Sequence, residues 1–258
     1  MEDEYFYGQG EVEVAEELAG GVLGPWVWLG DVSEMNGALS QTAISHRESY
    51  SGKKGKVREF FTELGIDWNL TLHRLDTSNV ARFTLGKESS IVAGTVTGEQ
   101  FPNTIVNGNV VQLDHMNVSD VILTDSATPT PATLVRGTHY DYDVYGDVKI
   151  LTLPTSPAPT MPLKAAYSHG AVDQVAFLAG ERKSYALRYK GINLAENDQR
   201  CLVEMYKVSA GLIQQLAMIT SGNQLAGAPV TFTSLMDKTK PANGPLGQYG
   251  RYAVLRAA

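Results

Sequence analysis

The fold is decided by one stretch of sequence, RKSYALRYKGINLAENDQRCLVEMYKV, which spans Arg182–Val208. In its first arm Tyr185, Leu187 and Tyr189 alternate with small or charged residues, and its second arm alternates in the same way. Successive side chains of a β-strand point to opposite faces, so this repeat of two indicates strands rather than helices. With the polar segment Asn193–Arg200 as the link, the stretch predicts a long antiparallel hairpin with one buried face.

The second face of this hairpin carries charged residues on both arms. We expect Arg188, Lys190 and Lys207 to contact a neighbouring subunit, because charged side chains are poor core residues and good interface residues. Glu204 shares the charged surface. A solvated sheet face is the alternative, since antiparallel sheets often expose one side to water.

Composition places the chain among folded globular proteins rich in β-structure. Of its 258 residues, 43% are hydrophobic and 19% are charged. The 25 glycines and 11 prolines are spread among short apolar runs, which favours strands over a helical bundle. One cysteine cannot form a disulfide within the chain, so we expect folding in a reducing compartment. The acidic N-terminus does not look like a signal peptide, and no apolar run predicts membrane insertion.

Charge is segregated along the chain, although the net charge is only −7. Residues 1–46 contain no Lys or Arg. Their acidic residues are Glu2, Asp3, Glu4, Glu11, Glu13, Glu16, Glu17, Asp31 and Glu34. Residues 47–58 are cationic, with Glu48 the single acid among them. We predict that Ser45–Arg58 is a long mobile stacking loop that reaches the acidic region of another copy. Its candidate contact residues are Arg47, Tyr50, Lys53, Lys54, Lys56 and Arg58.

The first hundred residues predict a strand-rich domain. An opening hairpin pairs Glu11–Glu16 with Trp26–Val32 and places Glu11 and Glu13 on one face. Further strands are expected at Glu34–Ile44, Val57–Leu64 and Ile66–Leu75. One short helix is expected over Ser78–Leu85, capped by Asp76 or Thr77 and ended by Gly86.

The middle of the chain predicts an inserted module at residues 101–170, within a domain made of residues 1–100 and 171–258. Most of the prolines lie in this module, and short alternating runs separate the proline-rich loops. Its expected strands are Asn109–Leu113, Asp120–Thr124, Tyr140–Val144, Val148–Leu153 and Leu163–Tyr167. After it, we expect a returning strand at Asp173–Leu178, an ambiguous segment at Val208–Ile219, and a last hairpin of Pro229–Leu235 with Gly250–Leu255.

Catalytic, cofactor and metal sites are not predicted. The five histidines lack metal-ligand spacing, and no nucleophile or phosphate-binding motif occurs. Asp141, Asp143 and Asp147 around Gly146 form part of a calcium-loop pattern, but a tight turn is the favoured interpretation. We interpret Cys201 as a buried strand residue. An isoelectric point near 5.3 argues against a protein that grips nucleic-acid phosphates.

The order of these features resembles a major tail tube protein of long flexible-tailed (siphovirus-type) bacteriophages. The resemblance rests on EVEVAE with WVWLGDV, the segment HRESYSGKKGK, the capped helix TSNVARFTLG, the hairpin RYKGINLAENDQRCLVEMYKV and the strand FTSLMD. It covers most of residues 8–98 and 173–256 and implies a tail-tube-type β-sandwich or barrel with one short flanking helix.

The resemblance also implies a structural virion protein, assembled in the host cytoplasm, rather than an enzyme. Such subunits form hexameric rings whose joined sheets line a channel for DNA in transit, and the rings stack into a tube. Glu204, Glu11 and Glu13 are then candidates for the lumen. The implied partners are other copies of the chain and the tape measure, tail terminator and distal tail proteins.

Two other classes stay open. A tube protein of a contractile secretion system would share the fold. A carbohydrate-binding β-sandwich would use Trp26, Trp28 and Trp68 as an exposed stacking platform.

Overall fold

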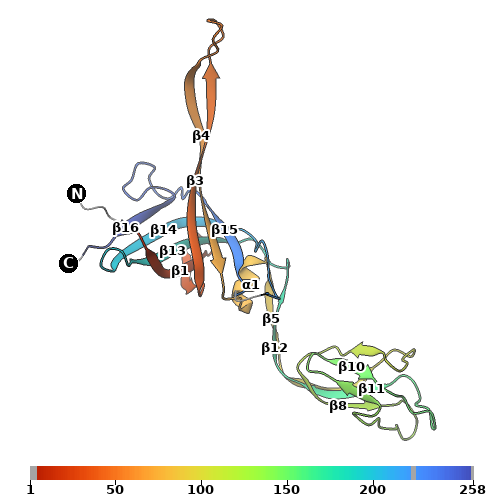
Figure 1. Ribbon diagram of the computed structural model, residues 1–258. Helices are drawn as coiled ribbons and strands as arrows, with labels where there is room; N and C mark the ends of the chain where they lie inside the picture. The colour runs from red at the N-terminus through yellow and green to blue at the C-terminus, as the bar shows by residue number, and fades with distance from the viewer. Residues whose placement is uncertain (1–4, 222–224, 257–258) are drawn as a thin grey trace. The chain divides into compact units, whose positions relative to one another are not determined.

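The computed structural model describes residues 5–221 and 225–256, which divide into two compact units (Figure 1). Unit 1 comprises Met1–Lys87 and Val175–Ala258, and unit 2 comprises Glu88–Gln174. Both are built mainly of antiparallel strands, so the predicted mainly-β fold is confirmed. The second unit is wider than the predicted module, because residues 88–100 and 171–174 also belong to it. Glu2, Asp3 and Glu4 lie outside the described residues.

Unit 1 is organised around one large sheet with the strand order β2-β1-β13-β14-β15-β4-β3, and β16 also pairs with β14. The predicted central hairpin is confirmed as β13 and β14, with Leu187 opposite Met205 and Arg188 opposite Glu204. The strands are β1 (Gly8–Glu17), β2 (Leu23–Trp28), β3 (Val32–Arg47), β4 (Lys56–Leu72), β13 (Ser184–Asn193), β14 (Gln199–Ala210), β15 (Ala228–Ser234) and β16 (Gly250–Val254).

Strand β14 pairs along one edge with two different strands, β15 and β16 (Figure 1). Its residues Cys201–Met205 pair with β16, whereas Val208–Ala210 pair with β15. The expected hairpin of the last two strands is therefore wrong, because each pairs with β14 rather than with the other. The sequence after Ala210 continues without a helix as far as Ile219.

The core of unit 1 lies between the β1–β13–β14 part of the sheet and the β4–β15 part. The fully buried Leu187 and Phe232 come from the two parts, and Phe83 from the helix meets Phe232 edge-on with ring centroids 5.7 Å apart. Buried apolar side chains of this cluster are Val12, Val14, Leu29, Leu70, Leu72, Phe83, Tyr185, Leu187, Met205, Val208, Val230 and Phe232.

Helix α1 (Thr77–Phe83) begins as the sequence predicts, but it ends differently. Asp76 is the N-cap and accepts a hydrogen bond from the backbone of Asn79 at 2.8 Å. At the other end Leu85, not Gly86, adopts the left-handed conformation, with φ of 49°. The Gly86 amide donates to the carbonyl of Ala81 at 2.7 Å, so a helical carbonyl is satisfied one residue beyond the strained position.

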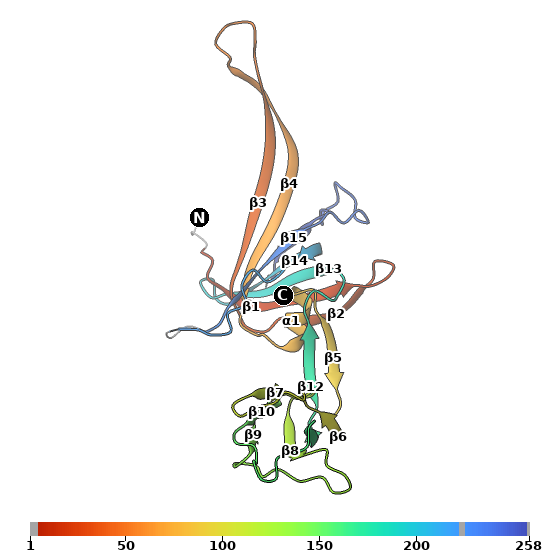
Figure 2. The same cartoon turned by 90° about the vertical axis from the view of Figure 1, so that its right-hand side faces the viewer.

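Strands β3 and β4 form a hairpin that extends well beyond the rest of the sheet (Figures 1 and 2). β4 runs without a break through the two strands expected at Val57–Leu64 and Ile66–Leu75. The predicted long loop Ser45–Arg58 is correspondingly shorter, because β3 continues to Arg47 and β4 begins at Lys56. Strand β15 pairs with β4 only from Asp67 onward, so the outer part of β4 has β3 as its only partner.

Unit 2 contains two three-stranded sheets, β7-β10-β9 and β6-β11-β8. The strands expected for the inserted module are all present, whereas β6 and the strand at Lys87–Ile91 were not predicted. Their bounds are β6 (Gly94–Gln100), β7 (Val110–Gln112), β8 (Val118–Thr124), β9 (Tyr140–Tyr142), β10 (Asp147–Ile150) and β11 (Lys164–His169). β5 (Lys87–Ile91) and β12 (Val172–Ala176) pair as a separate two-stranded sheet.

Buried Asp125 ties the proline-rich loops of unit 2 together. Its carboxylate accepts hydrogen bonds from the backbone amides of Thr160 at 3.1 Å and Ala132 at 2.6 Å. These bonds and a weaker one from Ala127 lower the pKa of the Asp125 carboxyl group. Prolines prevent regular strand pairing in these loops, so the Asp125 carboxylate accepts hydrogen bonds from backbone amides that would otherwise lack a partner.

Each unit has a hydrophobic core made only of its own residues, so we expect two thermal transitions in the whole chain. Replacing residues 91–172 by an Asn-Gly turn should leave unit 1 folded, because Ser90 and Asp173, hydrogen-bonded at 2.5 Å, would still face each other. Scanning calorimetry should show a single transition for this variant, at the position of one of the two original transitions. An unfolded variant would contradict the independence of unit 1.

Candidate functional site

The sheet face of unit 1 that points away from the core carries a row of charged residues across four strands. Reading the register from β2 to β16, Trp28 lies opposite Glu13, Glu13 opposite Arg188, Arg188 opposite Glu204, and Glu204 opposite Arg251. Acidic and basic residues thus alternate across β1, β13, β14 and β16. We call Glu13, Arg188, Glu204 and Arg251 the charged row.

Ion pairs hold the charged row together within one chain. The Glu13 carboxylate binds the Arg188 guanidinium and also accepts from Lys190 Nζ at 2.6 Å. Arg251 Nε donates to Glu204 Oε2 at 2.8 Å. The Arg188 guanidinium carbon also lies 4.0 Å from the centroid of the Trp26 ring, at cation–π distance.

Apart from Glu11, the predicted lumenal acids and interface cations have ion-pair partners inside the subunit. Glu13 and Glu204 are paired with cations, whereas Glu11 is exposed and lies opposite Lys190 in the register. Lys207 binds Glu17 at 2.7 Å. The formal charges of the four acids and four cations named so far cancel; these residues are Glu11, Glu13, Glu17, Glu204, Arg188, Lys190, Lys207 and Arg251.

Glu13 is the most buried carboxylate of this surface, with a side chain 11% exposed. Burial raises the pKa of the Glu13 carboxyl group, but hydrogen bonds from Lys190 and Arg188 lower that pKa by more. The pKa therefore lies below its ordinary value. A carboxyl group with a lowered folded-state pKa stabilises the fold above its unfolded-state pKa, and the contribution disappears as pH falls through the folded-state value.

Replacing Glu13 by Gln should lower the free energy of unfolding by about 1.5–3 kcal/mol at pH 7, because two cations lose a charged hydrogen-bond partner. The difference between wild type and Glu13→Gln should be constant above about pH 5 and shrink below about pH 4, where the glutamate takes up its proton. Urea unfolding at several pH values measures this. A difference that stays constant down to pH 3 would exclude the ion pair as its cause.

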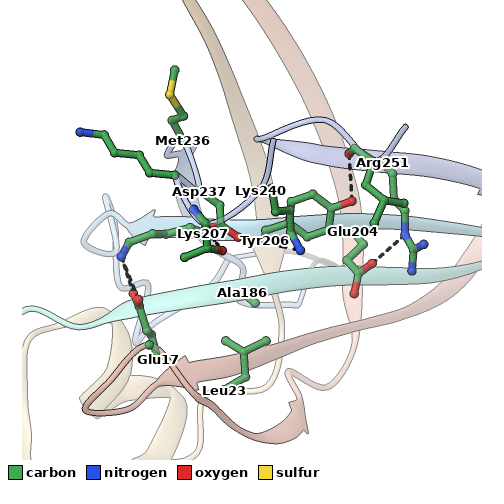
Figure 3. A pocket seen from close by; sticks show the side chains of 14 residues that line it. Glu17, Leu23, Ala186, Glu204, Tyr206, Lys207, Met236, Asp237, Lys240 and Arg251 are labelled. Carbon is green, nitrogen blue, oxygen red and sulfur yellow. Dashed lines mark hydrogen bonds and ion pairs between the residues drawn. The ribbon is translucent and has the colours of Figure 1, made fainter. Parts of the chain in front are cut away.

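A cavity of about 700 Å³ lies beside the charged row, under the loop that follows β15 (Figure 3). Figure 3 shows Glu17 reaching Lys207 and Glu204 reaching Arg251 across its lining. The Tyr206 hydroxyl donates to the Leu246 carbonyl at 3.0 Å, which fixes the loop to β14. Its three acids are all paired, Asp237 with Lys240 at 4.0 Å. The cavity therefore offers no unpaired carboxylate for acid–base chemistry.

The cationic hairpin tip is a closed turn rather than a long mobile loop. The Glu48 amide donates to the Gly55 carbonyl at 3.0 Å, and Arg47 Nη1 donates to the Lys54 carbonyl at 3.3 Å. Gly52 and Lys54 adopt positive φ angles of 75° and 48°, which lets the chain reverse. Tyr50 is 86% exposed.

The tip also keeps uncompensated positive charge. Lys56 forms an ion pair with Glu59 at 2.5 Å. Within the described part of the chain, Lys53, Lys54 and Arg58 form no ion pair. We therefore retain the tip as a candidate contact surface for an acidic partner.

An apolar stripe on the same hairpin escaped the sequence analysis. In the β3–β4 register Leu39 lies opposite Ile66, Gln41 opposite Leu64, and Ala43 opposite Phe61. Residues directly opposite share one face, so these side chains form a continuous stripe. Leu39, Leu64 and Phe61 are 81%, 66% and 62% exposed. The signal in the sequence was the run of apolar residues in EFFTELGI, which is too apolar for a solvated ribbon.

The free edges of the large sheet are not those of the central hairpin. β13 pairs with β1 as well as with β14, and β14 pairs with β15 and β16. An oligomer joined through unpaired edges of β13 and β14 is therefore excluded. The strands at the ends of the order are β2 and β3, and each has one partner; β16, beside the order, also pairs with β14 alone.

The three tryptophans do not lie together on the surface. Trp26 is covered by Arg188, Trp68 packs against the core, and Trp28 is 49% exposed, so the three do not form one exposed platform.

Within residues 5–221 and 225–256, no group of three His, Cys, Asp or Glu could hold a metal ion. Asp143 closes the predicted turn by accepting from the Tyr145 and Asp147 amides. No helix in the described ranges is long and apolar enough to cross a membrane.

Comparison with known families places nearly the whole chain in one family. The family described as "Protein of unknown function UCP028589" matches residues 5–253. No curated protein matches the sequence.

Proposed function

We propose that this chain, which belongs to the family UCP028589, is the subunit of the tail tube of a long flexible-tailed bacteriophage. Copies of unit 1 form closed rings, six to a ring as the sequence resemblance implies, and the rings stack into a tube through which DNA passes. The protein is then a structural part of the virion and not an enzyme. Its partners are other copies and, at the tube ends and interior, the tail terminator, distal tail and tape measure proteins.

The β3–β4 hairpin is the observation that carries the proposal. A two-stranded ribbon is at best marginally stable in water. This one also exposes Leu39, Phe61 and Leu64 on one face. Burying apolar surface would stabilise the protein by about 25 cal/mol per Å². A partner that always covers this surface would stabilise the hairpin by burying the apolar side chains. In a homopolymer that partner is another copy.

Ring closure is best served by the sheet ends. β2 and β3 each have one free edge, and pairing the β2 edge of one copy with the β3 edge of the next is head-to-tail. Head-to-tail contacts generate closed rings when the rotation fits. The expectation of joined sheets is therefore kept, with different strands at the joint.

The charge balance of the outer sheet face suits a channel that DNA must leave as easily as it enters. Binding to DNA grows with the number of phosphates that cations neutralise. Here each cation of the charged row already has a carboxylate partner, so the face supplies little net attraction. Two of the three acids expected in the lumen, Glu13 and Glu204, are thus neutralised by cations of the same subunit.

Electron microscopy of the purified protein tests the proposal directly. We expect rings or tubes ~100 Å wide, an estimate from six copies of a domain of this size. Light scattering should show a mass that grows with protein concentration. Monomers alone at high concentration and after long incubation would overturn the assembly.

A further inference from the structure

A groove of about 960 Å³ lies at one end of unit 1, between the base of β3 and the strands β1, β13, β14 and β16. Five of its fifteen lining residues are aromatic. Phe6, Tyr7 and Tyr252 are about 60% exposed there, at 59%, 64% and 60%, and Trp68 and Tyr189 form the deeper part. These aromatic side chains lie among polar residues, a composition typical of protein–protein contact surfaces.

The groove is also acidic. Among its lining residues Asp31 and Glu34 are charged, and neither Lys, Arg nor His lines it. Both carboxylates belong to exposed residues, and within the described residues neither forms an ion pair. An occupant that offers aromatic surface and positive charge would therefore complement it.

The hairpin tip offers both. Residues Ser49–Gly55 carry the exposed Tyr50 beside Lys53 and Lys54, which form no ion pair in the described chain. A tyrosine provides a large rigid contact area with a polar end and is favoured at the centre of interfaces. We propose that the groove binds the hairpin tip of a second copy of this chain. This inference rests on the proposed assembly and names the contact that joins successive copies.

The geometry of β3 excludes the chain's own tip as the occupant. Met35 lines the groove and Arg47 begins the tip, and both lie on the same extended strand. Twelve residues at ~3.3 Å each separate them by about 40 Å. A domain the size of unit 1 has a radius of gyration of about 16 Å, so a ribbon of this length reaches across a neighbouring copy.

Disulfide trapping tests the contact with the full chain. Ser33 lines the groove and Ser49 precedes Tyr50, so one batch carries Ser33→Cys and another Ser49→Cys, each with Cys201→Ala to remove the native thiol. Mixing and mild oxidation should give about tenfold more cross-linked dimer than a mixture with Glu181→Cys in place of Ser33→Cys, because docking raises the local thiol concentration to the millimolar range. Glu181 is exposed and lies outside the groove.

The outcomes separate this inference from the proposed function. Tubes in the microscope without a Ser33→Cys to Ser49→Cys cross-link above the control would overturn the groove contact and leave the tube intact. Monomers alone would overturn both.

A charge exchange supplies a second readout. Lys53→Glu with Lys54→Glu should abolish assembly, and adding Asp31→Lys with Glu34→Lys to the same chain should restore it. Failure of the second pair to restore assembly, in a chain that remains folded, would contradict the assignment of the groove.

Discussion

A chain in which Ser40–Gly65 are replaced by the dipeptide Asn-Gly is expected to fold normally and to remain monomeric at every concentration. Leu39 and Ile66 are opposite each other in the register, so a two-residue turn can join them without shifting β3 or β4. The deleted residues contribute no side chain to either hydrophobic core. Thermal unfolding should therefore change by no more than a few degrees, while light scattering and microscopy should lose all rings and tubes.

The chain without residues 91–172 is the matched control, because it removes a larger segment that includes most of the second unit. It is expected to assemble. Tubes formed by the shortened hairpin would show that the ribbon does not join copies and would remove the main support for the proposed function.

Replacing each of two phenylalanines by alanine should change the stability of the subunit by very different amounts. Phe232 is fully buried and packs edge-on against Phe83, so Phe232→Ala should cost about 3–5 kcal/mol of stability and lower Tm by roughly 10 °C. Phe61 is 62% exposed on the hairpin, so Phe61→Ala should cost less than about 1 kcal/mol. Calorimetry measures both effects on the isolated subunit.

Assembly should be affected more by Phe61→Ala than by Phe232→Ala, the reverse of their effects on stability. Below its lowered Tm the Phe232→Ala chain should still form tubes, whereas Phe61→Ala should raise the concentration needed for assembly. A small apolar loss repeated at every copy acts many times along a tube. Equal assembly by wild type and Phe61→Ala would show that the apolar stripe is not an interface.

Alternation of apolar and polar residues predicted the strands that have one face in the core and the other in solvent. Tyr185 and Leu187 are buried on β13, and the short strands of unit 2 were found for the same reason. The start of the helix was also predictable, because Asp76 caps it through a local bond to Asn79. These signals lie within a few residues of the structure that they specify.

The features that the sequence did not predict are of two kinds. Some depend on contacts between residues far apart in the sequence, and one, the outer ribbon, has no contact partner within the described chain except its own two strands. The outer ribbon is exposed on both faces, so apolar and polar residues do not alternate along it. The sequence therefore predicts a loop at Ser45–Arg58 that is longer than the observed turn. Glu13 and Arg188 are 175 residues apart, and nothing near either residue indicates the other. The pairing of β13 with β1 was not predictable, because periodicity describes the faces of a strand and not its neighbours.

The pairing of β1 with β13 has a consequence for how the chain folds on the ribosome. β1 leaves the exit tunnel before β13 has been synthesised, and until then β2 is its only strand partner. Unit 2 lies entirely between them in the sequence and can close its core during that wait. Contacts so distant in sequence make folding slow and leave apolar strands exposed. The nascent first unit is therefore the stage at which chaperones should engage this protein, with the second unit already folded.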